Sequence, residues 1–147
     1  MKTLFLFLFN FFFLSPPVPW ENDFTKAKEL SKQDKKTLLL YFTGSDWSSP
    51  SIKMEKLLFE SNEFQNYAAA NLVLVYADFP HLKDNKLEAY LSRQNKHLAE
   101  KYNPNGYFPY TVLLDNNDRV LRTWYGLPKI SPDNFVKQLN DAIDEYR

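Results

Sequence analysis

Two long apolar runs in the sequence predict buried strands. Residues 37–43 read TLLLYFT, and residues 71–79 read NLVLVYADF. Strands that are covered on both faces carry near-continuous apolar residues, whereas half-exposed strands alternate with polar ones. Two further strands are expected at residues 107–115 and 119–126. The turn-forming segment 116–118 joins them, which predicts a hairpin.

Helical periodicity accounts for the segments between these strands. Apolar positions recur at helical spacing in residues 23–32, 50–60, 61–68, 87–102 and 131–146. The predicted order is helix, strand, helix, short helix, strand, helix, strand, strand, helix. Strands that alternate with helices, followed by a hairpin and a last helix, predict an α/β fold. Its mixed central sheet is flanked by helices.

The N-terminal segment, residues 1–19, differs from the rest of the chain. A lysine at position 2 precedes residues 4–14, which are apolar apart from Asn10. That run is shorter than the about 20 residues that a membrane-spanning helix needs. A charged start and a short apolar run predict a secretory signal peptide and an exported, periplasmic or extracytoplasmic protein. The segment 15–20 has no Ala-x-Ala-like cleavage site, so an uncleaved membrane tether and a buried N-terminal strand remain alternatives.

The charge balance and the lack of cysteine exclude several classes of function. The remaining residues, 20–147, suit one domain with a sizeable core. Eighteen basic side chains balance eighteen acidic ones, so a nucleic-acid partner is not expected. The chain has no cysteine, which excludes disulfides, cysteine–metal sites and thiol nucleophiles. No metal-ligand cluster or phosphate-binding loop is recognised, so neither a metal nor a cofactor is expected.

The segment 41–54, YFTGSDWSSPSIKM, is the most informative part of the chain. A buried strand runs through a loop that contains Gly44 into a helix that begins near Pro50. The N-terminus of a helix offers unpaired N–H groups and a partial positive charge. In thiol chemistry that position lowers the pKa of a cysteine, yet this chain has serine at both Ser48 and Ser51.

This segment resembles the active-site segment of the thioredoxin family, where a tryptophan is followed by Cys-x-x-Cys. Here Trp47 is followed by Ser48-Ser49-Pro50-Ser51, so the serines at 48 and 51 stand at the two cysteine positions. The resemblance covers roughly residues 20–146 and implies the thioredoxin fold. The loops at 43–46 and 78–80 are similar to those of exported bacterial members.

The resemblance also implies a site for polypeptides. In the family, a cis proline faces the two-cysteine loop, and the backbone before it pairs with an extended substrate by strand addition. Pro109 fits that place, and a trans proline that opens an edge strand is the alternative. Trp47 and Phe108 would then supply apolar contacts. The buried acid that thioredoxins carry in the preceding strand is missing from residues 38–42, and Asp46 is expected to face solvent.

Three functions remain open. The first is an exported thioredoxin-fold protein that binds extended or unfolded polypeptide clients without redox turnover. The second is a thiol-disulfide oxidoreductase, of the reductase or isomerase type, whose two active-site cysteines are replaced by serine in this chain. The third is an enzyme with Ser48 or Ser51 as nucleophile, which needs a base within hydrogen-bond reach. His81 and His97 are expected on the surface away from the loop, which argues against this third function.

Overall fold

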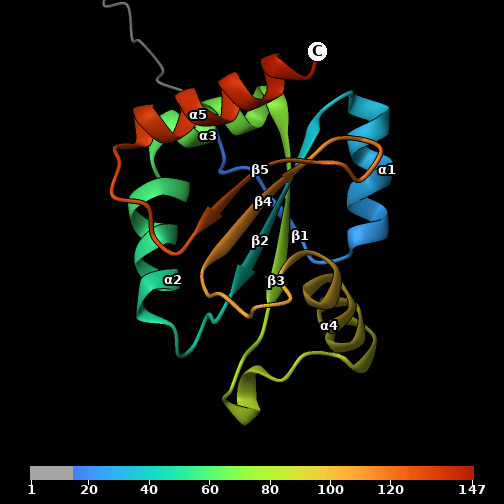
Figure 1. Cartoon of the computed structure of the whole chain (residues 1–147). Coiled ribbons are helices and arrows are strands. Elements are labelled where there is room, and N and C mark those ends of the chain that lie inside the picture. The colour runs from blue at the N-terminus through green and yellow to red at the C-terminus, as the bar shows by residue number, and fades with distance from the viewer. Residues whose placement is uncertain (1–14) are drawn as a thin grey trace, which may run out of the picture.

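The computed structural model describes residues 15–147, so the expected leader lies outside the described residues over positions 1–14. A five-stranded mixed sheet, in the order β1-β3-β2-β4-β5, forms the centre of the molecule (Figure 1). The elements are β1 (Trp20–Glu21), α1 (Phe24–Asp34), β2 (Thr37–Thr43), α2 (Ser49–Met54), a π-helical turn η1 (Glu55–Phe59), α3 (Asn62–Asn71), β3 (Leu72–Asp78), a 3₁₀ turn η2 (Lys83–Asn85), α4 (Ala89–Tyr102), β4 (Tyr110–Leu114), β5 (Val120–Tyr125) and α5 (Pro132–Glu145). The predicted α/β architecture with a mixed sheet is confirmed.

β2 occupies the middle of the sheet because its side chains are buried on both faces. It runs parallel to β3 and antiparallel to β4. Successive side chains of a strand point to opposite faces, so Leu39 and Tyr41 pack with α2, α3 and α5. Leu38, Leu40 and Phe42 pack on the other face, with α1 and α4 (Figure 1). The near-continuous apolar run therefore marks a strand between two helical layers.

β1 is a strand that the sequence pattern did not predict. Its two residues pair in parallel with β3, and the ring of Trp20 lies 5.1 Å from that of Phe59 and 5.7 Å from that of Tyr76. The backbone N–H of Val18 donates to Gln65 Oε1 at 2.7 Å. A two-residue strand is too short to show a period, so only its contacts reveal it.

The helix expected over residues 50–60 is present as α2 followed by η1, but its second half is not an α-helix. It changes from α to π geometry at Glu55, where the N–H of Glu60 donates to the carbonyl of Glu55 at 2.9 Å. The wider turn accompanies the burial of two successive side chains, Leu58 and Phe59. The expected strand 107–115 is shorter because Pro109, which has no N–H to donate, precedes its first residue.

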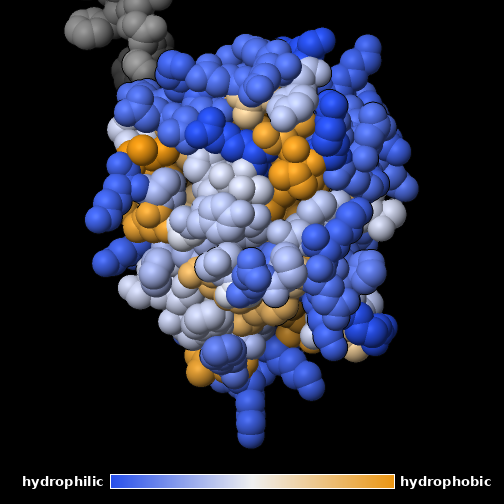
Figure 2. Space-filling model, in the orientation of Figure 1, coloured by the Kyte–Doolittle hydropathy of each residue, from blue (hydrophilic) through white to orange (hydrophobic). Residues whose placement is uncertain are grey.

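The surface of the molecule is mixed in character. Figure 2 shows small orange apolar patches separated by blue and white residues on the face seen in Figure 1. The exposed large apolar side chains lie on separate elements, among them Leu57 on η1, Leu82 before η2 and Val120 on β5. The described residues on this face therefore form no single broad apolar surface.

Candidate functional site

The two serines that stand at the family's cysteine positions face each other. Ser48 is the N-cap of α2, and its Oγ accepts a hydrogen bond from the N–H of Ser51 at 3.3 Å. Ser51 Oγ donates to Ser48 Oγ at 2.8 Å. Ser48 is 4% exposed and Ser51 is fully buried. The loop and the first turn of α2 thus bring together the two positions that a short disulfide would join.

Neither serine is arranged as a nucleophile. Among residues 15–147, no histidine or carboxylate is hydrogen-bonded to either hydroxyl. The other partner of Ser48 Oγ is the carbonyl of Phe108, at 3.4 Å, and Ser51 Oγ accepts from the N–H of Gly44 at 3.4 Å. A serine nucleophile needs an adjacent base to take its proton. The geometry therefore does not support the third function.

Trp47 is held by the loop on one side and by the segment after β3 on the other. Its Nε1 donates to the carbonyl of Phe79 at 2.8 Å, while 41% of the residue remains exposed. A Cβ built on Gly44 would lie 2.3 Å from Trp47 Cε2. Only glycine at position 44 leaves room for the indole in this place.

The expectation that His81 lies away from the loop is wrong. Its imidazole is exposed, but it stacks on the indole of Trp47, with ring centroids 4.5 Å apart. The cause is the carboxylate of Asp46, which accepts from the N–H groups of His81 and Leu82 at 2.9 Å and from Asn85 Nδ2 at 3.1 Å. Asp46 and His81 are 35 residues apart in the sequence, so no local pattern predicts this contact.

Asp46 is therefore more than a solvent-facing loop residue, because it anchors the segment that follows β3. The backbone N–H of His81 is the main cause that lowers the pKa of Asp46 below its ordinary value. Hydrogen bonds from Leu82 and Asn85 act in the same direction. His97, in contrast, lies on the solvent side of α4, as expected, 3.9 Å from Glu100.

Phe108 and Pro109 lie opposite the serine loop. The Phe108–Pro109 peptide bond is cis. The ring of Phe108 lies edge-on to Trp47, with centroids 5.4 Å apart, and to Phe79, at 5.3 Å. The carbonyl of Pro109 accepts from the N–H of Gly126 at 2.9 Å. We call the area formed by Trp47, Phe108 and Pro109 the Trp47–Phe108 surface.

A half-buried acid that the sequence reasoning missed lies near the end of β2. The carboxylate of Glu55 accepts from Thr43 Oγ1 at 3.2 Å and from Tyr76 Oη at 3.1 Å. Burial raises the pKa of Glu55, and the two hydroxyls oppose that shift in part. The sequence could have indicated this acid, because Glu55 follows Ser51 by four residues and therefore lies on the same side of the helix.

The described residues contain neither a metal-binding cluster nor a membrane-spanning helix. Between positions 15 and 147, no three histidine or acidic side chains gather closely enough to hold a metal ion. In the same range, no helix combines the length and the apolarity that crossing a bilayer requires.

Comparison with known sequences gives consistent matches. The model of a family described as thioredoxin-like matches residues 19–116. A protein named disulfide bond reductase DsbH, from Chlamydia pneumoniae, is 38% identical over 102 residues, which cover 69% of this chain and 59% of that protein. A thioredoxin-related protein, DsbJ, from the same organism is 31% identical over 107 residues, or 73% of this chain and 30% of that protein. The chain thus spans less than two thirds of both relatives.

Solved structures agree with these matches. A structure described as DsbH oxidoreductase superposes with a TM-score of 0.80 at 31% identity, covering 88% of this chain and 87% of that one. A thioredoxin from Thermus thermophilus superposes with a TM-score of 0.64 at 15% identity over 87% of this chain and 88% of that one. The second likeness concerns the fold alone, and the fold is the thioredoxin fold.

Proposed function

The chain belongs to the thioredoxin-like family, and from this premise we propose that it binds extended or unfolded polypeptides without redox turnover. The observation that carries the proposal is the pair of hydrogen-bonded hydroxyls, Ser48 and Ser51, at the cysteine positions of a thioredoxin fold. Serine cannot form a disulfide, so the loop lacks dithiol chemistry. In this proposal the Trp47–Phe108 surface beside the loop binds the polypeptide.

The Trp47–Phe108 surface supplies two kinds of contact for an extended chain. Trp47 offers a partly exposed indole whose orientation is fixed by its contacts with Phe79 and His81. The backbone N–H of Phe108 has no hydrogen-bond acceptor among the described residues, so it is free to pair with a client. Strand addition combines such backbone hydrogen bonds with side-chain contacts.

A direct test is the binding of a labelled, unfolded peptide without cysteine, followed by fluorescence anisotropy. We expect Trp47→Ala to weaken binding by roughly 1–2 kcal/mol, about 5- to 30-fold in Kd, if the indole anchors the peptide. Tyr146→Ala removes a comparably exposed aromatic residue near the C-terminus and serves as the matched control. Equal affinity of wild type and Trp47→Ala would contradict the proposal.

A second candidate function is favoured by the relative that is named a disulfide bond reductase. In that case the serines at positions 48 and 51 replace cysteines that a redox-active form of the protein carries. For the chain as it stands, we expect insulin reduction at the rate of dithiothreitol alone. Sequencing the encoding gene distinguishes the two candidates, because cysteine codons at both positions would establish the second.

We also infer that the protein is exported. The basis is the charged start and apolar run of the first 14 residues, which lie outside the described part of the chain. Cell fractionation of a C-terminally tagged protein tests this inference. Recovery in the soluble extracytoplasmic fraction would support export with cleavage, whereas recovery in the membrane fraction would indicate a tether. A purely cytoplasmic protein would contradict export.

A further inference from the structure

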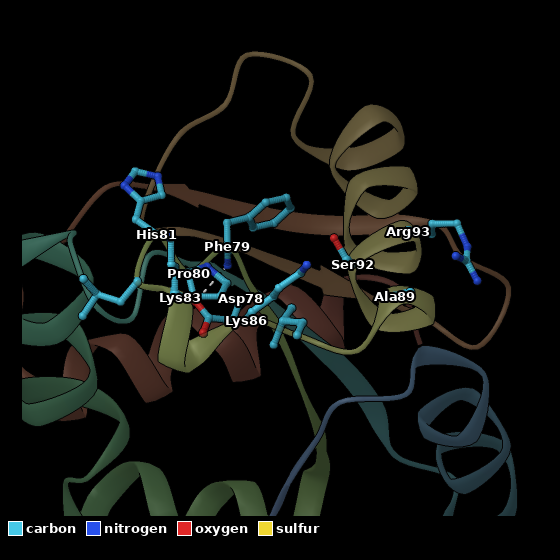
Figure 3. Close-up of a pocket in the computed structure, with 11 residues that line it drawn as sticks. Asp78, Phe79, Pro80, His81, Lys83, Lys86, Ala89, Ser92 and Arg93 are labelled. Atoms are coloured by element: carbon cyan, nitrogen blue, oxygen red, sulfur yellow. Dashed lines mark hydrogen bonds between the residues drawn. The ribbon is translucent and has the colours of Figure 1, made fainter.

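A cleft of about 790 Å³ opens beside the Trp47–Phe108 surface. Figure 3 places Phe79 and His81, from the segment after β3, on one side of it and Ser92 and Arg93 of α4 on the other. The volume falls in the range of roughly 300–1,000 Å³ that is usual for ligand sites. No residue of the serine loop lines this cleft.

Three of the residues that line this cleft are cationic, and they lie among apolar neighbours. Lys83, Lys86 and Arg93 contribute to the lining, and none of the three has an ion-pair partner among residues 15–147. The carboxylates of Asp84 and Glu88 belong to the same segment but do not line the cleft. Three unpaired cations around one cavity favour an anionic group.

One carboxylate, that of Asp78, does line the cleft. Its Oδ1 accepts from the N–H groups of Ser45 and Phe79, at 3.0 and 2.8 Å, and its Oδ2 accepts from Ser45 Oγ at 2.5 Å. These bonds commit both oxygens to the loop. At the opposite end, no side chain caps the N-terminus of α4, whose first residue, Ala89, also lines the cleft. The partial positive charge of that helix end adds to the three cations.

The cleft and the Trp47–Phe108 surface share residues. Phe79 accepts the indole hydrogen bond of Trp47 through its carbonyl and contacts Phe108 through its ring. His81 stacks on Trp47 and also lines the cleft. Each extended residue advances a chain by about 3.3 Å, so a peptide that lies on Trp47 reaches the cleft within a few residues.

We propose that the cleft binds aspartate or glutamate side chains of the polypeptide that lies on the Trp47–Phe108 surface. The clients are then extended segments with an acidic flank. This inference rests on the proposed polypeptide binding and adds the class of client. Exposed ion pairs contribute little each, and their main effects are on selectivity and association rate. Three together are expected to favour an acidic flank about fivefold at low salt.

The test compares two labelled peptides of the same apolar core, one with a Glu-Asp-Glu flank and one with Gln-Asn-Gln. Anisotropy titrations are made on the wild type, on Lys83→Gln/Lys86→Gln/Arg93→Gln and on Trp47→Ala. The matched control, Lys32→Gln/Lys129→Gln/Arg147→Gln, changes the net charge equally at exposed positions that do not line the cleft. We expect the preference for the acidic peptide to disappear in the cleft variant and to persist in the control and in Trp47→Ala.

Each outcome bears on one of the two proposals. If wild type binds both peptides equally, the acidic-flank proposal is wrong, while polypeptide binding stands. The same conclusion follows if the control variant loses the preference as fully as the cleft variant, because net charge would then explain it. If neither peptide binds, the proposed function fails and the client class fails with it. If citrate displaces the acidic peptide as readily as an unlabelled copy does, the cleft is a site for small anions and the proposal is overturned.

Discussion

The imidazole of His81 lies nearly parallel to the indole of Trp47, with 4.5 Å between the ring centroids and 6° between the ring planes. This contact joins the serine loop to the segment that follows β3. Together with the space left by Gly44 and the hydrogen bond to Phe79, it holds the indole of Trp47 in one orientation.

Gly44→Ala should displace the indole of Trp47. The added methyl group would lie 2.3 Å from Trp47 Cε2, so the ring must move and lose its bond to Phe79. We expect a loss of roughly 1–3 kcal/mol in the free energy of unfolding, as for an overpacked site, with peptide binding as weak as in Trp47→Ala. Urea unfolding measures the loss. In a Trp47→Ala background the same substitution should cost much less, and an equal cost there would refute the clash.

Asp46→Asn should loosen the segment that carries His81. The carboxylate accepts from the N–H groups of His81 and Leu82 through its two oxygens, whereas an amide has one acceptor oxygen. We expect faster hydrogen exchange at both amides, measured by NMR. The pKa of Asp46 is depressed, so its contribution is present above the ordinary value of 3.8 and is lost as pH falls through the lowered one. Asp34→Asn, at an exposed position, is the control and should leave both amides unchanged.

Glu55→Gln should change how stability depends on pH. Burial raises the pKa of Glu55 in the folded state above its ordinary value of 4.5. Between pH 4.5 and the raised pKa, the carboxyl group of Glu55 therefore keeps its proton in the folded state and loses it in the unfolded chain. Its stabilising effect is fully present below pH 4.5 and is lost as pH rises through the folded-state pKa. Glutamine keeps an acceptor oxygen for the hydroxyls of Thr43 and Tyr76 and does not titrate. Urea unfolding between acid and neutral pH should show the wild type losing stability relative to Glu55→Gln, and parallel curves would contradict this.

Ser48→Cys with Ser51→Cys should create a disulfide couple. The two Oγ atoms are 2.8 Å apart, and the N–H of Ser51 already points at the side chain of residue 48. We expect an intramolecular disulfide in a glutathione redox series and a pKa of the thiol at position 48 below the free value of about 8.5. Thiol titration and the pH dependence of alkylation measure both. Ser48→Cys alone is the control. Thiols that never pair would show that the loop is not built as a thioredoxin site.

Much of the fold could be predicted from the sequence because it depends on local patterns. The apolar run of residues 37–43 predicted a doubly covered strand, and it became the central β2. The resemblance of the segment around Trp47 to the family's active-site segment identified Ser48 and Ser51 as the two cysteine positions, and the structure brings their hydroxyls together. Strand and helix periods are properties of neighbouring residues, so they can be read without coordinates.

Other features were decided only by the tertiary structure. Asp46 draws the segment with His81 onto the loop, and Lys83, Lys86 and Arg93 meet around one cleft only because that segment turns back towards α4. The two-residue β1 exists because β3 offers it a partner. The sequence by itself determined the longer helices and strands, their order and the positions of the two serines, since these follow from local patterns. The orientation of Trp47 and the charge of the cleft arise from contacts between distant residues, which no local pattern encodes.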